Sequence, residues 1–266
     1  MTCRDMDDVI SSRTRDSVLE PQPAEHLIHC EQCRSLTRLL DEADDGRRPS
    51  ESLLRRIKAG ILGDLRPIRP LAPSRILLFR SAIIFLSVLA VGVLLLGMKG
   101  WGAVNIVQRI VVFVTLAACA VLLANSMVRQ MVPGSKEACA PAVLLVAILV
   151  VLMMVIAATF RPQRESAFIV GGLICMKNGF MFSIPAAFLL WFILRRGAIL
   201  YPRLIGAVAG GLAGLAGLSV LEVNCPNLNA FHILIWHEGV VVISSLGGSL
   251  LGATVESIQR WRRKVF

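Results

Sequence analysis

The sequence predicts an all-α protein in which a small helical zinc-binding head precedes a bundle of six transmembrane helices. Hydrophobic residues make up 55% of the 266 residues, and the mean hydropathy of +0.69 is too high for an ordinary soluble protein. Six apolar segments follow residue 75, whereas the first 45 residues are polar and carry closely spaced histidine and cysteine. We divide the chain into the head (residues 1–45), a connecting region (46–75) and a transmembrane domain (76–266).

The six apolar segments are each long enough to cross the hydrocarbon core, which takes about 20 helical residues. They are residues 79–97, 106–128, 140–160, 168–194, 204–223 and 233–255. An even number of spans returns both termini to one side. The loops and tails on that side carry 12 Lys and Arg residues and the opposite side carries 4. Because basic residues accumulate in cytoplasmic loops, we expect both termini in the cytoplasm.

The net charge of +10 does not indicate a nucleic-acid surface. Residues 1–75 contain 13 basic and 13 acidic residues, so the excess lies entirely in residues 76–266, beside the apolar segments. Basic residues in those positions orient the spans, and no basic stripe interleaved with aromatic residues is present. We therefore expect no direct binding to nucleic acid. The first 24 residues lack an apolar core, so we also expect no signal peptide.

The most specific motif is His26-x3-Cys30-x2-Cys33, in a helix predicted over residues 24–40. His26 and Cys30 are four residues apart and share one helix face, and a tight bend would bring Cys33 to the same point. An imidazole and two thiolates are three of the four ligands of a tetrahedral Zn²⁺ site. Either Cys3 or His29 is left as the fourth ligand. A reducing cytosol favours this metal site over a disulfide.

The connecting region predicts an amphipathic helix with an apolar face for a protein partner. Ser50 is a suitable N-cap, and basic side chains lie opposite the apolar ones. The predicted partner-binding residues are Leu53, Leu54, Ile57, Ile61 and Leu65. Prolines from residue 67 onward end the helix and form a stiff neck.

Small residues predict close helix contacts in the last two spans. Glycines recur at positions 206, 210, 211, 214 and 217 of the fifth span and at 239, 247, 248 and 252 of the sixth. Such faces let helices approach closely in lipid. Tight packing within one bundle is the main interpretation. A dimer interface, and so a homo-oligomer, is the alternative.

Cys175 and Cys225 both lie near the predicted outer ends of spans, where an oxidising compartment permits disulfides. His232 and His237 follow Cys225 closely. Two unrelated structural cysteines are the alternative interpretation. The ionisable residues of the spans, Lys177, Glu222 and Glu238, lie near the outer boundary, and we expect their side chains to extend toward the interface.

The sequence argues against two further functional classes, carriers and enzymes. No charge lies at the middle of a span, which argues against an ion or proton carrier. No hydrolase, kinase or nucleotide-binding motif is present, so we expect no enzyme.

Two parts of the chain resemble families of bacterial regulators. His26-Leu27-x2-Cys30-x2-Cys33-Arg34, with Leu39-Leu40, resembles the zinc-binding head of many bacterial anti-sigma factors and covers about residues 3–45. From residue 64 to the end, the chain resembles the six-span negative regulators of sigma-F-type extracytoplasmic-function sigma factors. The matching points are the neck at 64–71, Cys175 with Pro185, the turn at 194–198, the Gly/Ala-rich fifth span, and Asn224-Cys225-Pro226 with Trp236.

These resemblances imply a membrane-bound anti-sigma factor of the bacterial inner membrane. Such a protein holds an extracytoplasmic-function sigma factor away from RNA polymerase until stress releases it. In the six-span family two cysteines, matching Cys175 and Cys225, are associated with sensing, so we predict redox sensing there. A transporter or channel subunit with a regulatory zinc head is the alternative, and an assembly protein without sensing is a third.

Overall fold

The computed structural model describes residues 3, 21–44, 51–64, 71–132, 135, 139–163, 168–197 and 199–265. The chain divides into two units, residues 1–69 and 70–266, which are described separately. The predicted all-α fold is confirmed. Within the described ranges the elements are helices, and the β structure is limited to an isolated bridge between Arg161 and Asn229.

The N-terminal unit contains three described helices, and the first two differ from the prediction. α2 runs over Pro21–His29, α3 over Glu31–Asp44 and α4 over Glu51–Asp64. The prediction of a single helix over residues 24–40 is wrong, because the helix is interrupted at Cys30. The Arg34 side chain stabilises the break, since its Nε donates to the Leu27 carbonyl at 2.9 Å and its other end reaches the carbonyl of Ile28. These carbonyls lie in the last turn of α2, where intrahelical partners run out.

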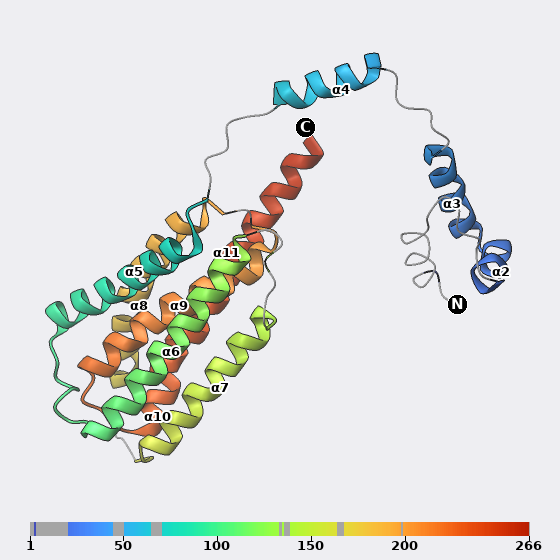
Figure 1. Cartoon of the computed structure of the whole chain (residues 1–266). Helices are drawn as coiled ribbons and strands as arrows, with labels where there is room; N and C mark the ends of the chain where they lie inside the picture. The colour runs from blue at the N-terminus through green and yellow to red at the C-terminus, as the bar shows by residue number, and fades with distance from the viewer. Residues whose placement is uncertain are drawn as a thin grey trace. The chain divides into compact units, whose positions relative to one another are not determined.

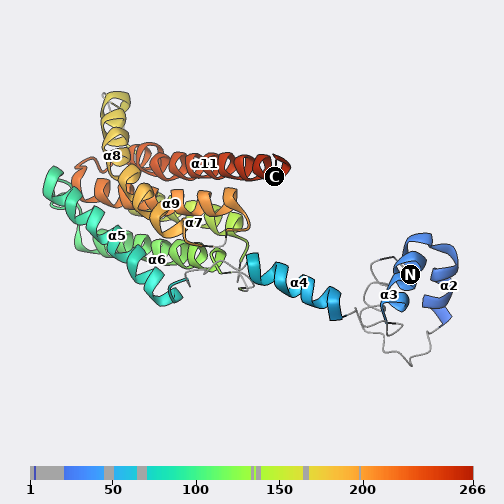
Figure 2. The same cartoon turned by 90° about the horizontal axis from the view of Figure 1, so that it is seen from above.

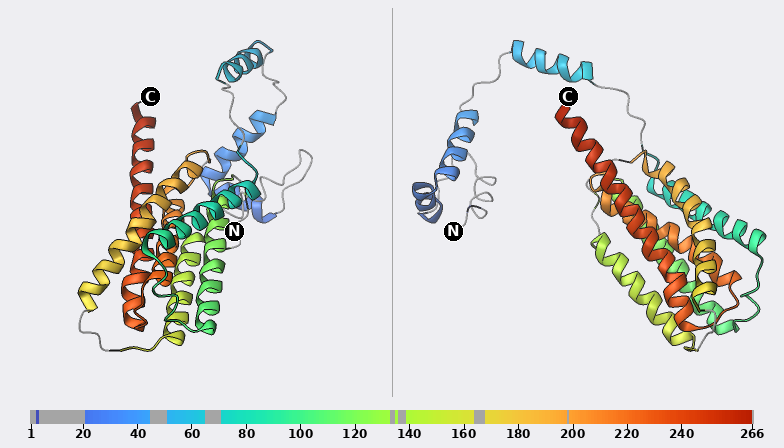
Figure 3. Two further views of the ribbon diagram at one scale, coloured as in Figure 1. Left: turned by 90° about the vertical axis from the view of Figure 1, so that its left-hand side faces the viewer. Right: turned by 180° about the vertical axis from the view of Figure 1, so that it is seen from behind.

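The second unit contains six helical segments that are long and apolar enough to cross a membrane. They are α5 (Ser74–Leu96), α6 (Ile106–Gln130), α7 (Pro141–Thr159), α8 (Phe168–Leu194), α9 (Pro202–Asn224), and a sixth segment made of α10 (Ala230–His232), the π-helix η1 (Ile233–His237) and α11 (Glu238–Val265). Five predicted spans match their helices to within five residues at each end. The sixth segment is longer than predicted, and α11 extends past the other helices of this unit (Figure 3).

Helix α9 occupies the centre of the second unit, with other helices on several sides (Figures 1 and 2). In its most apolar stretch 83% of the residues are buried, compared with 17% to 28% in the other five segments. Those five expose large apolar side chains, such as Leu94 with 83% of its surface accessible. An apolar exterior around a buried helix is what a lipid environment requires, because lipid-facing side chains gain nothing from burial in protein.

Glycines decide how α9 meets α11. A Cβ at Gly206 would strike the carbonyl oxygen of Gly248, and one at Gly248 would strike that of Gly206. Similarly, a Cβ at Gly210 would meet the Ser244 carbonyl, and one at Gly252 the Pro202 carbonyl. Nothing lies within 4 Å of a Cβ at Gly247, whereas the predicted internal packing is confirmed for these four glycines. They are used within one bundle, so they give no support to the dimer alternative.

Two adjacent glycines of α11 allow a matched test of this contact. Gly248→Ala should lower the free energy of unfolding by about 1–3 kcal/mol, because its methyl group meets the backbone of α9. Gly247→Ala should be neutral or stabilising by up to about 1 kcal/mol, because nothing lies within 4 Å of the added Cβ and alanine favours helix. Unfolding in detergent, followed by circular dichroism, measures both. Equal effects would contradict the proposed contact.

Candidate functional site

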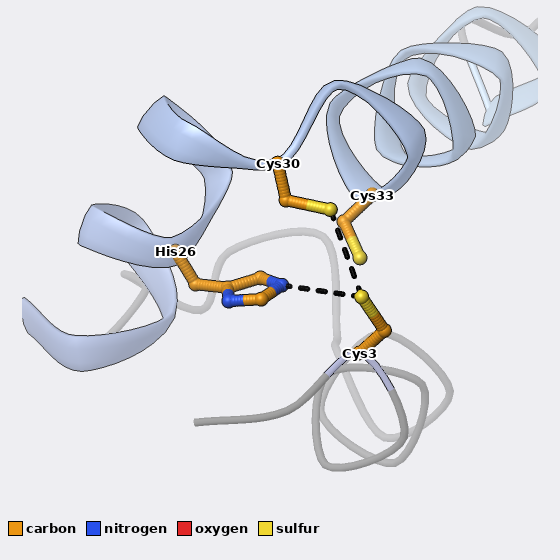
Figure 4. A group of neighbouring side chains, drawn as sticks. All are labelled: Cys3, His26, Cys30 and Cys33. Atoms are coloured by element: carbon orange, nitrogen blue, oxygen red, sulfur yellow. Dashed lines mark hydrogen bonds between the residues drawn. The ribbon is translucent and has the colours of Figure 1, made fainter.

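The structure brings four potential metal ligands together in the N-terminal unit (Figure 4). This head site consists of Cys3, His26, Cys30 and Cys33. Their ligand atoms all lie within 4.8 Å of one another, and the Cys3 Sγ is 3.8 Å from His26 Nε2 and 3.7 Å from Cys30 Sγ. Tetrahedral Zn²⁺, with bonds of about 2.0–2.3 Å, places neighbouring ligands roughly 3.3–3.8 Å apart. Both the donor types and their spacing therefore fit Zn²⁺.

The helix break at Cys30 is what forms the head site. His26 lies in the last turn of α2, Cys30 at the break and Cys33 in the first turn of α3. The backbone N–H of Cys30 still bonds the His26 carbonyl at 2.9 Å, so these two side chains keep their helical relation. The chain then turns, and Cys33 points back toward them (Figure 4). A continuous helix would have kept Cys33 on the same face but about 10 Å along the axis from His26, too far apart for both side chains to bind one ion.

The thiols of the head site have opposed proton affinities. The backbone N–H of Cys33 and the Cys3 thiol bond to Cys30 and lower its pKa. Burial, together with the neighbouring Cys30 thiol, raises the pKa of Cys33 to about 12. Crowding of this kind makes it unfavourable for all the thiols to ionise by themselves. A bound cation removes that difficulty, because thiolates are the form that a metal ion binds.

The geometry favours Cys3 over His29 as the fourth ligand. Cys3 contacts two of the other three members of the head site. His29, the last residue of α2, is exposed and lies outside the group. Adjacent residues point about 100° apart around a helix, so His29 and its neighbour Cys30 face different directions.

The predicted partner-binding face lies on α4. The helix covers four of its five residues, and Leu54 and Ile57 are about half exposed, at 49% and 48%. Leu65 lies outside the described residues, and the side chains of Leu53 and Ile61 are likewise not described. Two neighbouring apolar side chains thus remain accessible on this helix.

In the second unit the structure places Cys175 beside Cys225. Cys175 lies in the second turn of α8 and Cys225 caps the end of α9, and their sulfurs are 3.4 Å apart without a disulfide. His232 Nε2 lies 3.4 Å from Cys175 Sγ and 3.8 Å from Cys225 Sγ. The two cysteines are therefore neighbours in space, and a sensing role for them stays a prediction. We call Cys175, Cys225, His232 and His237 the bundle-end cluster.

Two carboxylates near the bundle-end cluster correct a prediction. Glu222 and Glu238 were expected to extend toward the interface, but both are buried, with 8% and 5% of their surface accessible. Glu222 faces inward because α9 is enclosed by its neighbours, and its Oε1 lies 2.9 Å from His237 Nδ1. No sequence pattern predicts this pair, because Glu222 and His237 belong to different spans.

Loop contacts close the end of the bundle around Cys225. Gly100 and Trp101, in the loop after α5, donate backbone hydrogen bonds to the carbonyls of Asn224 and Val223. A Cβ at Gly100 would strike the Cys225 carbonyl, so the loop lies directly against this residue. Asn224 in turn donates through its side chain to the Leu96 carbonyl at 2.6 Å. The position of Cys225 is thus fixed by a loop as well as by α9.

Comparison with known sequence families matches residues 62–261 to the family described as Negative regulator of sigma F. The chain belongs to this family. Membership implies that the protein negatively regulates a sigma factor. The match includes all six apolar helices and the bundle-end cluster, and it confirms the resemblance of the transmembrane domain. The head precedes the matched region, so its resemblance to zinc-binding anti-sigma heads stays a prediction. Neither the curated proteins nor the solved structures contain a significant match.

The fourth ligand of the head site can be tested by substitution. Cys3→Ser should weaken Zn²⁺ binding at least tenfold, because a ligand that completes the tetrahedron is lost. His29→Ala should leave the affinity unchanged, since His29 lies outside the group. Competition with a chromophoric chelator, with the full chain in detergent and under reductant, measures both affinities. All proteins in this test carry Cys175→Ser and Cys225→Ser, so that the head site supplies the clustered thiols. A larger loss with His29→Ala would assign the fourth position to His29.

Proposed function

We propose that this protein is a membrane-bound anti-sigma factor that sequesters an extracytoplasmic-function sigma factor and releases it on redox or metal stress. The observation that carries the proposal is the family match over residues 62–261, which contains a cysteine pair with sulfurs 3.4 Å apart. The protein acts by binding and has no catalytic step. It resides in the bacterial inner membrane, with both termini in the cytoplasm, as the distribution of basic residues indicates.

The N-terminal unit supplies the contact with the sigma factor in this proposal. Zn²⁺ at the head site would fix the angle between α2 and α3, because a small helical region has too little core to fold firmly by itself. The exposed Leu54 and Ile57 of α4 provide an apolar surface. An amphipathic helix that presents such residues at helical spacing is suited to lie in a groove of a partner protein.

Release would begin at the cysteine pair. Hydrogen peroxide can remove two electrons and two protons from the thiols of Cys175 and Cys225, which forms one S–S bond and two molecules of water. A thiophilic metal ion would instead bind both sulfurs as thiolates. Either event joins the start of α8 to the end of α9. Because α9 packs along α11, α8 and α5, a change at this end alters the packing of the central helix against α5. Residues 65–73 connect α5 to α4.

The second candidate is a transporter or channel subunit with a regulatory zinc head. The buried Glu222–His237 pair favours it, because ionisable residues inside spans often mark ion pathways. However, both residues lie within one end of the bundle, and the described span centres are apolar or small. Solute flux in proteoliposomes distinguishes this candidate from an anti-sigma factor.

The role of α4 can be tested by sigma binding. The full chain in detergent should retain one of the host's extracytoplasmic-function sigma factors, each purified individually. Leu54→Ala/Ile57→Ala should weaken this binding at least tenfold, because apolar surface in the interface is lost. Arg55→Ala/Arg56→Ala, on the opposite side of α4, is the matched control and should bind within about threefold of the parent.

Two outcomes contradict this assignment of α4. An equal loss in the arginine variant would show that charge, not the apolar face, holds the partner. Failure of the parent chain to retain any of these sigma factors, with Zn²⁺ and reductant present, would remove the proposed function itself.

The sensing role can be tested in cells with a reporter under the control of the sigma factor. Cys175→Ser and Cys225→Ser should each reduce the induction by peroxide or Cd²⁺ to about the uninduced level, because neither the disulfide nor the thiolate pair can form. Cys119→Ala is the control, since Cys119 is buried in α6 at a distance from the pair in sequence and structure. Full induction in the serine variants would place the sensor elsewhere.

A further inference from the structure

The bundle-end cluster holds more than a thiol pair. Two cysteines and two histidines from α8, the end of α9, α10 and η1 place one ligand atom each within 4.8 Å of all the others. Three of the four residues are buried, and Cys175 is partly exposed. The three distances among Cys175 Sγ, Cys225 Sγ and His232 Nε2 are 3.4, 3.4 and 3.8 Å and match the roughly 3.3–3.8 Å edges of a zinc tetrahedron. We propose that Cys175, Cys225, His232 and His237 bind Zn²⁺ as a second metal centre at the end of the transmembrane bundle.

The π-helix η1 is what brings the two histidines together. His232 and His237 are five residues apart, and in an α-helix such residues point about 140° away from each other. η1 spans Ile233–His237, and its wider turn adds a residue, so both rings project on nearly the same side. Their centroids lie 5.5 Å apart, with the rings almost perpendicular. π-Helical turns are rare and frequently lie at functional sites, which suits a turn whose effect is to pair two ligands.

Glu222 completes the arrangement expected around a metal-bound histidine. His237 Nδ1 lies 2.9 Å from Glu222 Oε1, which fixes the ring and leaves Nε2 for a ligand. Nε2 is buried and makes no hydrogen bond within the described structure. A buried imidazole nitrogen is costly to leave without a partner. Metal-bound histidines commonly donate their other N–H to a carboxylate, so Glu222 is the positioning residue for His237.

The charges and donor types select the ion. Two thiolates and two neutral imidazoles carry a charge of −2, which a divalent cation cancels, so the four ligands and the ion are together neutral, beside the Glu222 carboxylate that contacts His237. A tetrahedral set of two sulfurs and two nitrogens is typical of Zn²⁺, whereas Mg²⁺ and Ca²⁺ prefer oxygen ligands. The partial exposure of Cys175 gives an ion a side from which to enter. The rings of Phe168 and Trp236 pack at 5.7 Å beside the histidines and form an apolar surround.

The test uses the full chain in detergent with Cys30→Ser and Cys33→Ser, which removes the head site. Co²⁺, which takes tetrahedral zinc sites and has visible and near-ultraviolet absorption, is titrated into the reduced, metal-free protein. One equivalent should bind, with a thiolate-to-cobalt charge-transfer band and tetrahedral ligand-field bands, and Zn²⁺ should displace it. Cys225→Ser and His237→Ala should lose these bands, while Cys119→Ala should keep them.

Glu222→Gln provides a milder variant that separates metal binding from misfolding. It should keep the cobalt spectrum but weaken binding by about 10–100-fold, as loss of a ligand's hydrogen-bonding partner does. In the background without the head site, Zn²⁺ should also protect Cys175 and Cys225 from alkylation. The proposal is overturned if no thiolate–cobalt band appears, if the band survives in Cys225→Ser, or if Zn²⁺ leaves alkylation of both cysteines unchanged. No sigma factor is involved, so failure here would leave the sigma binding of the proposed function untouched.

Discussion

The structure of the transmembrane unit depends on the backbone contact between α9 and α11. At Gly206 and Gly248 each helix leaves no room for a Cβ on the other, so the two helices touch backbone to backbone. In lipid, apolar burial contributes little to helix association, and close packing of small residues replaces it. A central helix with 83% of its apolar stretch buried is possible only because small side chains let its neighbours approach. The other helices then form the outer surface around it.

This contact also determines where the chemistry lies. Because α9 and the sixth segment are held side by side, Glu222 near the end of α9 reaches His237 at the end of η1. Cys225, one residue beyond α9, meets Cys175 of α8 at the same level. Side chains with no sequence relation are thereby assembled where the bundle meets its loops. At this position one member of the cluster, Cys175, is partly exposed, while Cys225 caps the central helix.

The head site and the bundle-end cluster both depend on an interrupted helix, but the interruptions differ. Each assembles cysteine and histidine ligands by interrupting a helix: a break at Cys30 in the head, and the π-turn of residues 233–237 in the sixth segment. In the head the interruption is stabilised by Arg34, which bonds carbonyls at the end of α2. In the bundle it is stabilised by packing and by the Glu222 contact. A zinc ion at either place would make the local fold depend on the oxidation state of thiols.

The sequence alone determined the all-α class, the six apolar helices and the His26, Cys30 and Cys33 motif, because these depend on hydrophobic length and on residues within eight positions of one another. It also placed glycines where α9 and α11 meet. Only the tertiary structure placed Cys175 beside Cys225 and brought His232 and His237 to them, since these contacts join separate helices. They also require a π-helical turn that no local sequence pattern predicts. Burial of Glu222 was decided in the same way. Which face of a span is enclosed depends on its neighbours, not on its own residues.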